Sequence, residues 1–549
     1  KMEVFLKVTE ERLNNQMMKM YNHSYPAMSY GTAGFRMEAD HKLMCVMYRV
    51  GITSALYAKY RTGKTVGVMI TASHNPVKDN GVKMIDEHGE MLPQAWEAEA
   101  EAIVNAKNGK ELLSEIKRII KDFSIDITKE GSVYVGMDTR PSSMQMFQSL
   151  MDGFNVFQLM TLNSVGKCST PQLHFLVKEA NEKNCGQTKR QYYQHMATHL
   201  LSFLETVEKK DPLSITVDCA FGVGGNVLAE FSAFLKQHGS PIEFNVVNGI
   251  PNQEQKKLLN DECGADFVQK SKVFPRNMPS NVDWFASFDG DADRIVFGYD
   301  AKQFKLIDGD KISALMAMFL SKHLTNLGVL ENLTMGVIQT AYANGASTAY
   351  LESVLPNGKK DIHCTATGVK HLHVKATEYD IGIYFEANGH GTVTFSSEFK
   401  KVIQNFEPSN DTQTRSLKLL KAWSNIINEC VGDALSDLLA CLLIFEDFSS
   451  LDYQKWNAFY NDLPSVLTKL QVKDRTAIKT TSDETRVLEP SNLQKLIDNY
   501  LDSLSYKIKR TFVRPSGTEN CVRIYAEADT AEHAKEIEAN VRKFVESEC

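Results

Sequence analysis

Several features that mark particular protein classes are missing from this sequence. None of its ten cysteines forms a C-x-x-C pair, and a chain of 549 residues needs no disulfide bonds to build a core. Reduced thiols are therefore favoured over a secreted disulfide framework or a zinc knuckle. The longest apolar stretches, such as residues 312–320, are well short of the ~20 residues that span a bilayer. The formal net charge of −7 gives no overall basic field for nucleic acid.

The start of the sequence also shows no targeting signal. Residues 1–13 contain neither the apolar core nor the cleavage site of a signal peptide. The hydrophobic fraction of 43% and the charged fraction of 23% are those of ordinary globular proteins, which excludes a disordered or collagen-like chain. We expect a cytoplasmic enzyme with no membrane or nucleic-acid partner and no obligatory protein partner. Local lysine and arginine clusters would have to hold any acidic substrate.

The pattern of apolar runs predicts an α/β fold. Short β-branched or aromatic runs end in polar loops that contain Gly or Pro, and many lead into helical patterns, at residues 65–71, 132–137, 213–218, 284–288, 335–340 and 381–386. This alternation favours βαβ units with parallel or mixed sheets, whose ligands bind beyond the carboxyl ends of the strands. The tail predicts a small α+β domain, with strands at 510–514 and 521–527 and a helix at 530–547. Residues 405–415 are interpreted as a surface loop.

Asp289, Asp291 and Asp293 form the strongest local signal. Three carboxylates at alternate positions of a tight turn make an oxygen cage for a hard cation such as Mg²⁺. An EF-hand loop would need Gly at its sixth position, where Arg294 stands, and helices on both sides, where strands are predicted. A solvated acidic turn is the plain alternative, but three carboxylates repel one another unless a cation or an arginine compensates.

A second candidate is Ser73 in the segment TASHNP, at a bend between a strand and a loop. Followed by His74, this serine is a possible nucleophile, although the segment is not the G-x-S-x-G elbow of hydrolases. Taken alone, the segment is better explained as an ordinary turn. Lys83 lies in a second polar turn ten residues on. Its ammonium group is suited to holding phosphate or, with a lowered pKa, to moving a proton.

Two further loops carry polar groups suited to a phosphorylated sugar. In RPSGTEN, Gly517 permits a backbone nest, the hydroxyls can donate to an anion, and arginines supply bidentate charge. A plain turn remains the alternative, and the loop is not a Walker motif. In EANGHG, Glu386 and Asn388 can bond sugar hydroxyls or an amide, and His390 can act as general acid or base. The segment CAFGVGGN lacks the G-x-G-x-x-G pattern, so NAD binding receives little weight.

Taken in order, the motifs GTAGFR, TASHNP, DGDADR, EANGH and RPSGTEN resemble those of the α-D-phosphohexomutase superfamily. Five motifs in sequence are far more specific than one. Other points of match include DTRPSS, LIDGDKI and TGVKHLH. The chain looks most similar to the branch that acts on N-acetylglucosamine phosphate, partly because Asn388 stands where glucose- and mannose-phosphate relatives carry serine.

The resemblance implies four domains around a central cleft, three related mixed α/β domains and a smaller α+β domain. They would be residues 1–185 with a phosphoserine loop, 186–298 with a metal loop, 299–448 with a sugar loop and 449–549 with a phosphate loop. Ser73 would be the phosphoserine, and one Mg²⁺ would be held by Ser73, Asp289, Asp291 and Asp293. The remaining catalytic residues would be His74, Lys83, His390, Arg36 and Arg294. The substrate-binding residues would be Thr367, Gly368, Glu386, Asn388, Arg514, Ser516, Gly517, Thr518 and Arg523.

The reaction that this resemblance implies is the reversible conversion of N-acetylglucosamine 6-phosphate to the 1-phosphate, in UDP-N-acetylglucosamine biosynthesis. A sugar 1,6-bisphosphate would be both intermediate and activator. The alternatives are a phosphoglucomutase or phosphomannomutase and, less favoured, a metal-dependent sugar phosphatase that uses Ser73. Two features depart from the family pattern. Asn520 stands where an acidic residue is often expected, and residues 400–424 match no motif and are interpreted as an insertion.

Overall fold

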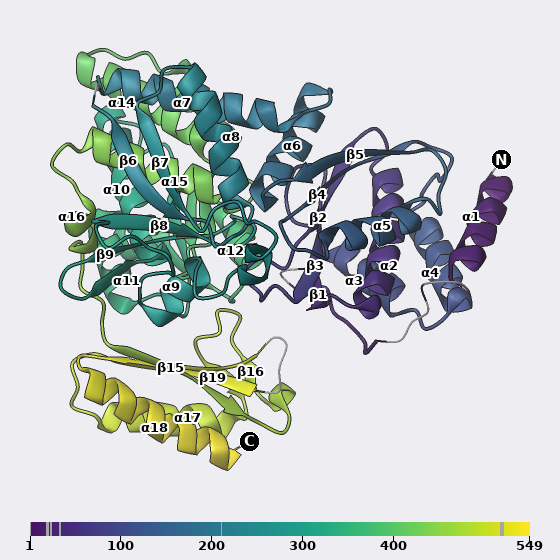
Figure 1. Cartoon of the computed structure of the whole chain (residues 1–549). Coiled ribbons are helices and arrows are strands. Elements are labelled where there is room, and N and C mark those ends of the chain that lie inside the picture. Colours follow the sequence, from purple (N-terminus) through teal and green to yellow (C-terminus); the bar gives the residue numbers. More distant parts are fainter. Residues whose placement is uncertain are drawn as a thin grey trace. The chain divides into compact units, whose positions relative to one another are not determined.

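A computed structural model describes residues 2–17, 21, 25–31, 34–209, 211–516 and 521–548. The chain divides into two compact units. Figure 1 labels their helices and strands. The first contains Lys1–Leu306 and Ala422–Leu443, and the second contains Ile307–Lys421 and Ile444–Cys549. Each unit holds sheets of its own, so each is described by itself.

The first sheet has five strands in the order β1-β3-β2-β4-β5. They are β1 (Phe35–Glu38), β2 (Thr65–Ile70), β3 (Asp79–Ile85), β4 (Gly131–Met137) and β5 (Met160–Lys167). Strands β2, β4 and β5 are parallel, whereas β3 runs antiparallel to both β2 and β1. The helices of this part are α1 (Met2–Met17), α2 (His41–Tyr60), α3 (Gln94–Asn105), α4 (Gly109–Asp122), α5 (Ser143–Phe154) and α6 (Thr170–Lys183).

Burial explains why these strands are continuous apolar runs. Every residue of β2 after Thr65 is buried, as expected for a parallel strand covered on both faces. Because β2 and β4 run in the same direction, the loops that follow them, residues 71–78 and 138–142, leave the same edge of the sheet. Helix α2 begins at a side-chain cap, since Asp40 accepts hydrogen bonds from the amides of Lys42 and Leu43.

The second sheet also lies mainly in the first unit and has the order β10-β9-β8-β6-β7. Its strands are β6 (Leu213–Asp218), β7 (Ile242–Val247), β8 (Trp284–Phe288), β9 (Ile295–Asp300) and β10 (Phe304–Ile307), accompanied by helices α7 (Lys189–Thr206), α8 (Gly224–Gln237) and α9 (Ala265–Ser271) and a 3₁₀ turn η1 (Gln255–Leu258). Strands β8 and β9 are antiparallel, and the acidic turn joins them. The flanks are therefore strands, as predicted, which excludes an EF-hand.

Residues 422–443 return to the first unit from the middle of the chain. They comprise the end of α14 (Asp411–Ile426) and most of α15 (Ala434–Asp447). The amide of Ala434, the first residue of α15, donates to the carbonyl of Ala292 in the acidic turn at 3.1 Å. The segment thus supports the acidic turn. The domain boundaries expected from the sequence placed this segment in the third domain and the acidic turn in the second. Part of the surface loop predicted at 405–415 is also helical, because α14 begins at Asp411.

The second unit contains a four-stranded sheet in the order β12-β11-β13-β14. Its strands are β11 (Met335–Thr340), β12 (Ile362–Thr365), β13 (Ile381–Phe385) and β14 (Gly391–Phe395), and its helices are α10 (Gly309–Leu327), α11 (Gly345–Val354), α12 (Val369–Ala376), α13 (Ser397–Asn405) and α16 (Tyr453–Asn457), with a 3₁₀ turn η2 (Gly358–Asp361). The apolar stretch 312–320 lies in the largely buried α10. In the part of the chain that the structure describes, no helix is both long and apolar enough to cross a membrane.

The tail folds as the predicted small α+β domain. Strands β15 (Ser465–Gln471), β18 (Lys509–Pro515) and β19 (Cys521–Ala528) form an antiparallel sheet in the order β15-β19-β18. Helices α17 (Ser491–Ser503) and α18 (Ala531–Glu548), a small hairpin of β16 (Lys479–Thr480) and β17 (Val487–Glu489), and a 3₁₀ turn η3 (Arg475–Ala477) complete it. The predicted strands at 510–514 and 521–527 are confirmed.

A close contact between α2 and α5 leads to a stability prediction. A Cβ atom at Gly153 would lie 1.8 Å from the Tyr48 carbonyl oxygen, so backbone would have to move. We expect Gly153→Ala to lower the free energy of unfolding of the first unit by about 1–3 kcal/mol, the usual cost of overpacking. Faster amide hydrogen exchange in α2 and α5 would report it. Gly109→Ala is the matched control, because its Cβ would meet only Asn14 Oδ1 at 3.9 Å. Equal exchange in both variants would contradict this account.

Candidate active site

Ser73 lies in the loop after β2, buried, with its backbone in the left-handed region at φ 50°. Its hydroxyl donates to Asp289 Oδ2 at 2.7 Å, and its amide donates to Thr71 Oγ1 at 2.9 Å. A residue with a Cβ rarely adopts this conformation unless its surroundings hold it there. The hydrogen bond joins the two strongest motifs of the sequence, which are 216 residues apart.

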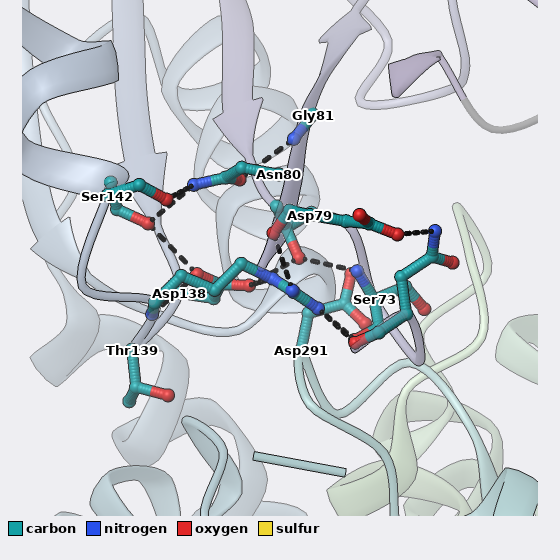
Figure 2. A network of polar contacts seen from close by, with 12 residues as sticks. Ser73, Asp79, Asn80, Gly81, Asp138, Thr139, Ser142 and Asp291 are labelled. Carbon is teal, nitrogen blue, oxygen red and sulfur yellow. Dashed lines mark hydrogen bonds and ion pairs between the residues drawn. The ribbon is translucent and has the colours of Figure 1, made fainter. Parts of the chain in front are cut away.

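Arg140 holds the carbonyl oxygens of this loop. Figure 2 shows Ser73, Asp79 and Asp138, which take part in this network. One terminal nitrogen donates to the Ser73 carbonyl at 2.8 Å and to the Asn75 carbonyl at 2.9 Å, and the other to the Pro76 and Asp79 carbonyls, both at 2.7 Å. Asp138 fixes the guanidinium through Nε at 2.9 Å. A rigid planar fork with five donors can bind four carbonyls and a carboxylate at once, which the three donors of lysine cannot do.

Asn260, which follows the 3₁₀ turn η1 between β7 and β8, holds the same loop. Its amide nitrogen donates to the Ser73 carbonyl at 2.9 Å and to the Asn75 carbonyl at 3.1 Å. Buried carbonyls need such partners, because an unpaired one costs about 1–3 kcal/mol. Arg140 and Asn260 together leave this loop one well-defined position, which orients the Ser73 hydroxyl.

The glycines of the acidic turn permit a close backbone approach. A Cβ at Gly290 would lie 2.6 Å from the Ser73 carbonyl oxygen, and one at Gly222 would lie 2.5 Å from the Gly290 carbonyl oxygen. The amide of Val223 also donates to that Gly290 oxygen at 3.0 Å. The segment CAFGVGGN, which resembles a dinucleotide loop only superficially, therefore supports the acidic turn from behind.

Asp289, Asp291 and Asp293 are all buried and offer carboxylate oxygens within 4.8 Å of one another. Lys83 lies on strand β3 and not in the polar turn expected from the sequence. Its Nζ donates to one oxygen each of Asp291 and Asp293, at 3.0 Å in both cases, and Thr170 Oγ1 donates to Asp291 at 2.6 Å. The structure thus brings together five residues that the sequence analysis placed in one site, namely Ser73, Lys83, Asp289, Asp291 and Asp293.

The cluster has a strongly perturbed electrostatic environment. Burial, with repulsion from Asp293 and Asp291, raises the pKa of Asp289 well above its usual range. Burial and Asp293 also act to raise the pKa of Asp291, but Lys83 and Thr170 stabilise its carboxylate, and this pKa lies below its usual range. Burial opposes the charge on Lys83, yet Asp291 and Asp293 outweigh it and raise the lysine pKa. Cationic charge is therefore what the cluster requires.

The donor set fits a hard divalent cation. All three acidic side chains offer oxygen, the ligand that Mg²⁺ prefers. Asp291 Oδ1 is buried and makes no hydrogen bond within the described residues, so it retains a lone pair for a ligand. The Ser73 hydroxyl lies beside this set through Asp289. A phosphate on that oxygen would present further oxygen ligands to the same cation.

Arg36, Arg294 and His74 surround the cluster. Arg36 Nη1 donates to Asn75 Oδ1 at 3.4 Å, and Arg294 Nε lies 3.8 Å from Asp289 Oδ2 and 3.7 Å from Asp293 Oδ1. Burial, followed by the charges of Arg294 and Arg36, lowers the pKa of His74 far below its usual range, so its imidazole is neutral. The two arginines bring positive charge to the place where a phosphoryl group would be transferred.

Glu386, Asn388 and His390 occupy one turn between β13 and β14 in the second unit. The Glu386 amide donates to the His390 carbonyl at 2.9 Å, and the His390 amide donates to Asn388 Oδ1 at 2.9 Å. Asn388 Nδ2 donates to Glu386 Oε2 at 3.3 Å. The predicted sugar loop is therefore a tight turn in which carboxylate, amide and imidazole lie within five residues of sequence.

The described part of the predicted phosphate loop lies on β18 and β19. Arg514 and Arg523 are direct cross-strand partners, and the Ser516 carbonyl accepts a hydrogen bond from Arg475 Nη1 at 2.6 Å. Gly517 and Thr518 fall outside the described residues. Thr367 and Gly368 immediately precede α12, and Gly368 has φ 123°.

Family models match four successive parts of the chain. Those described as phosphoglucomutase/phosphomannomutase, alpha/beta/alpha domain I and C-terminal domain, match residues 39–111 and 468–544. Those described as phosphoacetylglucosamine mutase AMG1, domain II and domain III, match residues 183–296 and 308–449. Fold and site thus define a four-domain phosphohexomutase. The match to domain III includes residues 400–424, which the sequence analysis interpreted as an insertion.

Whole-chain similarity gives the family. The chain is 42% identical to the phosphoacetylglucosamine mutase of Candida albicans, over 96% of this chain and 99% of the relative. It is 42% identical to that of Homo sapiens, over 92% of each chain. The chain belongs to the phosphoacetylglucosamine mutase family of the α-D-phosphohexomutase superfamily, and it is an isomerase. The resemblance stated from the motifs is confirmed.

Solved structures of relatives share the fold over nearly the whole length. An N-acetylphosphoglucosamine mutase from Aspergillus fumigatus in complex with GlcNAc-6P and magnesium has a TM-score of 0.90 and 37% identity, over 98% of each chain. A serine-to-alanine variant of the Aspergillus fumigatus enzyme in complex with glucose 1,6-bisphosphate has a TM-score of 0.89 and 37% identity, over 98% of this chain and 99% of that one.

Arg140 and Asn260 are positioning residues that the sequence analysis did not select. The turn DTRPSS was a point of match to the family, but no pattern in the sequence shows that its arginine faces the Ser73 loop. Asn260 lies in a segment without a motif. The order of the strands could have indicated Arg140. It follows β4 and Ser73 follows β2, and the loops after neighbouring parallel strands meet at one edge of a sheet.

We expect Arg140→Lys to lower mutase turnover by about 100-fold, since a displacement of roughly 1 Å at a reacting group has this effect. Lysine keeps the charge but cannot bind four carbonyls together. Steady-state kinetics on the purified variant would measure the loss, and circular dichroism would check its folding. Arg118→Lys is the matched control, because Arg118, on α4, is 40% exposed and pairs with Glu99 of α3. Turnover within twofold of the parent would rule out this role for Arg140.

Proposed function

We propose that Ser73 carries the phosphoryl group in a mutase reaction that interconverts N-acetylglucosamine 6-phosphate and 1-phosphate. This interconversion is the activity of the family, and this chain catalyses it. The observation that carries the proposal is the 2.7 Å hydrogen bond from the Ser73 hydroxyl to Asp289, within a cluster of three buried carboxylates. A serine in such a place is suited to phosphoryl transfer, which depends on positioning and charge neutralisation.

The chemistry proceeds in two transfers. The P–O bond of phospho-Ser73 breaks as a bond forms from phosphorus to the free sugar hydroxyl oxygen, O1 or O6, which loses its proton to a base. The resulting 1,6-bisphosphate turns end for end. The Ser73 oxygen then takes the other phosphoryl group. The sugar oxygen from which this group departs regains a proton. Lys83 and His390 are the two groups proposed for this proton transfer. Because Asp291 and Asp293 raise the pKa of Lys83, its protonated form is suited to returning a proton to the sugar oxygen rather than to accepting one.

Asp289, Asp291 and Asp293, with the phosphoserine, are the proposed ligands of one Mg²⁺. When bound, this ion supplies charge neutralisation at the phosphoryl group. Arg36 and Arg294 add positive charge, and the neutral His74 packs beside them. The magnesium complex of the Aspergillus fumigatus relative supports the choice of ion, and the glucose 1,6-bisphosphate complex supports a sugar bisphosphate as intermediate and activator.

The second unit supplies the proposed substrate-binding residues. Glu386 and Asn388 face the sugar in this proposal, and the substrate's non-reacting phosphate binds to the loop on β18 and β19, with Thr367 and Gly368 nearby. The residues assigned to that phosphate loop are Arg514, Ser516, Gly517, Thr518 and Arg523. The three boundaries between the four domains expected from the sequence, after residues 185, 298 and 448, remain part of this proposal.

We expect Ser73→Ala to lower turnover at least about 1000-fold, because the nucleophile is removed. Calorimetry should show that N-acetylglucosamine 6-phosphate still binds. Ser54→Ala is the matched control, since Ser54 is a buried serine whose hydroxyl donates to the Val50 carbonyl of its own helix. A Ser73→Ala variant that retains mutase turnover would exclude the phosphoserine, and phosphate release without isomerisation by the parent would favour a phosphatase.

Metal removal tests the carboxylate cluster. Treatment with EDTA should abolish turnover, and added Mg²⁺ should restore it. We expect Asp291→Asn to raise the Mg²⁺ concentration for half-maximal rate at least about tenfold, because a ligand oxygen loses its charge. Asp300→Asn, at an exposed strand end, should leave this concentration unchanged. Full activity of EDTA-treated enzyme would refute the metal assignment.

A further inference from the structure

Glu484 connects two of the proposed substrate-binding residues of the second unit. Its Oε2 accepts hydrogen bonds from the Thr367 amide at 3.0 Å and the Thr367 hydroxyl at 2.6 Å. The same oxygen lies 3.1 Å from Arg514 Nε. The pair is mostly shielded from water, with Glu484 16% and Arg514 12% exposed. No sequence motif includes Glu484.

A tight turn delivers this carboxylate. Residues 481–486 connect β16 to β17, and the Glu484 amide donates to the Thr481 carbonyl at 2.9 Å. Glu484 has φ 60°, a left-handed conformation. Asp483 Oδ1 holds the turn by accepting from the Thr485 amide at 3.1 Å and hydroxyl at 2.8 Å. A non-glycine residue held in this conformation by its neighbours indicates that its position is over-determined.

A second contact ties the same turn to the four-stranded sheet. Cys364, near the end of β12, donates its Sγ–H to the Asp483 carbonyl at 3.7 Å. The turn therefore contacts Cys364, which lies within β12, and Thr367, which lies between β12 and α12. On its other side, Glu484 reaches Arg514 on β18. Glu484 thus joins a loop of the sheet of β11–β14 to a strand of the tail domain.

The charge arrangement explains why a carboxylate belongs here. Arg514 and Arg523 are direct partners on adjacent antiparallel strands, so their side chains project from the same face. Like charges in this position repel, and a buried guanidinium needs an anionic partner. Glu484 approaches Arg514 at Nε. Contact on that side of a planar guanidinium leaves terminal nitrogens to bind a phosphate oxygen.

We infer that Glu484 is a positioning residue for the non-reacting phosphate group of the substrate. Its carboxylate orients the Arg514 guanidinium and holds the Thr367–Gly368 turn at a fixed place relative to it, so that the two segments bind the phosphate together. The inference rests on the proposed assignment of Arg514 to the phosphate loop. It adds a residue that itself makes no contact with the substrate.

The test is the kinetics of Glu484→Gln with N-acetylglucosamine 6-phosphate. Glutamine keeps the shape and one acceptor oxygen but removes the charge that orients Arg514. We expect KM to rise about tenfold and kcat to stay within about twofold, because a binding group rather than a reacting group is misplaced. The inhibition constant of inorganic phosphate should rise in parallel with KM. Phosphorylation of Ser73, measured by mass spectrometry, should equal that of the parent.

Thr367→Val tests the other half of the contact. It removes the hydroxyl that donates to Glu484, and we expect it to raise KM about threefold alone and to add little in the double variant with Glu484→Gln, because residues that act as a unit are not additive. Glu489→Gln is the matched control, since Glu489 is an exposed glutamate of the same hairpin that pairs with Lys479. Its KM should equal that of the parent.

Arg514→Lys separates this inference from the proposal on which it rests. An unchanged KM in Arg514→Lys would remove the phosphate assignment and the inference together. A raised KM in Arg514→Lys with an unchanged KM in Glu484→Gln would leave the phosphate site standing and overturn the role of Glu484. A lower KM in Glu484→Gln would also overturn it, because Glu484 would then compete with phosphate for Arg514.

Discussion

The mutual repulsion of three buried carboxylates is the constraint on which the rest of the site depends. Asp289, Asp291 and Asp293 cannot all remain charged at this spacing without a cation, and Lys83 brings one positive charge into the cluster. A divalent ion that binds there gains the field of all three carboxylates. Under the proposed function, a phosphate on Ser73 would be stable in this field only when that ion is present, so that the proposed nucleophile and the proposed metal site would depend on each other.

The fold meets this constraint by close backbone approach and by shared hydrogen bonds. Gly290 allows the acidic turn to reach the Ser73 backbone, and Gly222 allows a third loop to support the turn. Arg140, in the loop after β4, and Asn260, in the connection between β7 and β8, bind the same two carbonyls of the Ser73 loop. Positioning by donors that are already in place avoids reorganisation during the transfer, which is where phosphoryl-transfer enzymes gain most of their rate.

Much of this could be predicted from the sequence, for identifiable reasons. The α/β class follows from apolar runs that are continuous because parallel strands are buried on both faces, and the cluster of three carboxylates follows from their spacing in the sequence alone. The sequence analysis placed residues 411–415 in a loop because they are all polar or charged. They form the first turn of α14, and the buried residues of this helix begin only at Ser416. Glu484 and Asn260 could not be found, because each acts through contacts between segments far apart in sequence. The support of the acidic turn by residues 422–443 depends on tertiary packing that no local pattern encodes.

A crystal structure grown with Mn²⁺ in place of Mg²⁺ is the most direct test of the central claim, because Mn²⁺ scatters anomalously and prefers the same oxygen ligands. The account predicts one anomalous peak in the first unit, with oxygens of Asp289, Asp291 and Asp293 and an oxygen on Ser73 at about 2.1 Å. It also predicts that Lys83 yields its place between Asp291 and Asp293. A carboxylate cluster without a peak, with Lys83 still bound between those two aspartates, would contradict it.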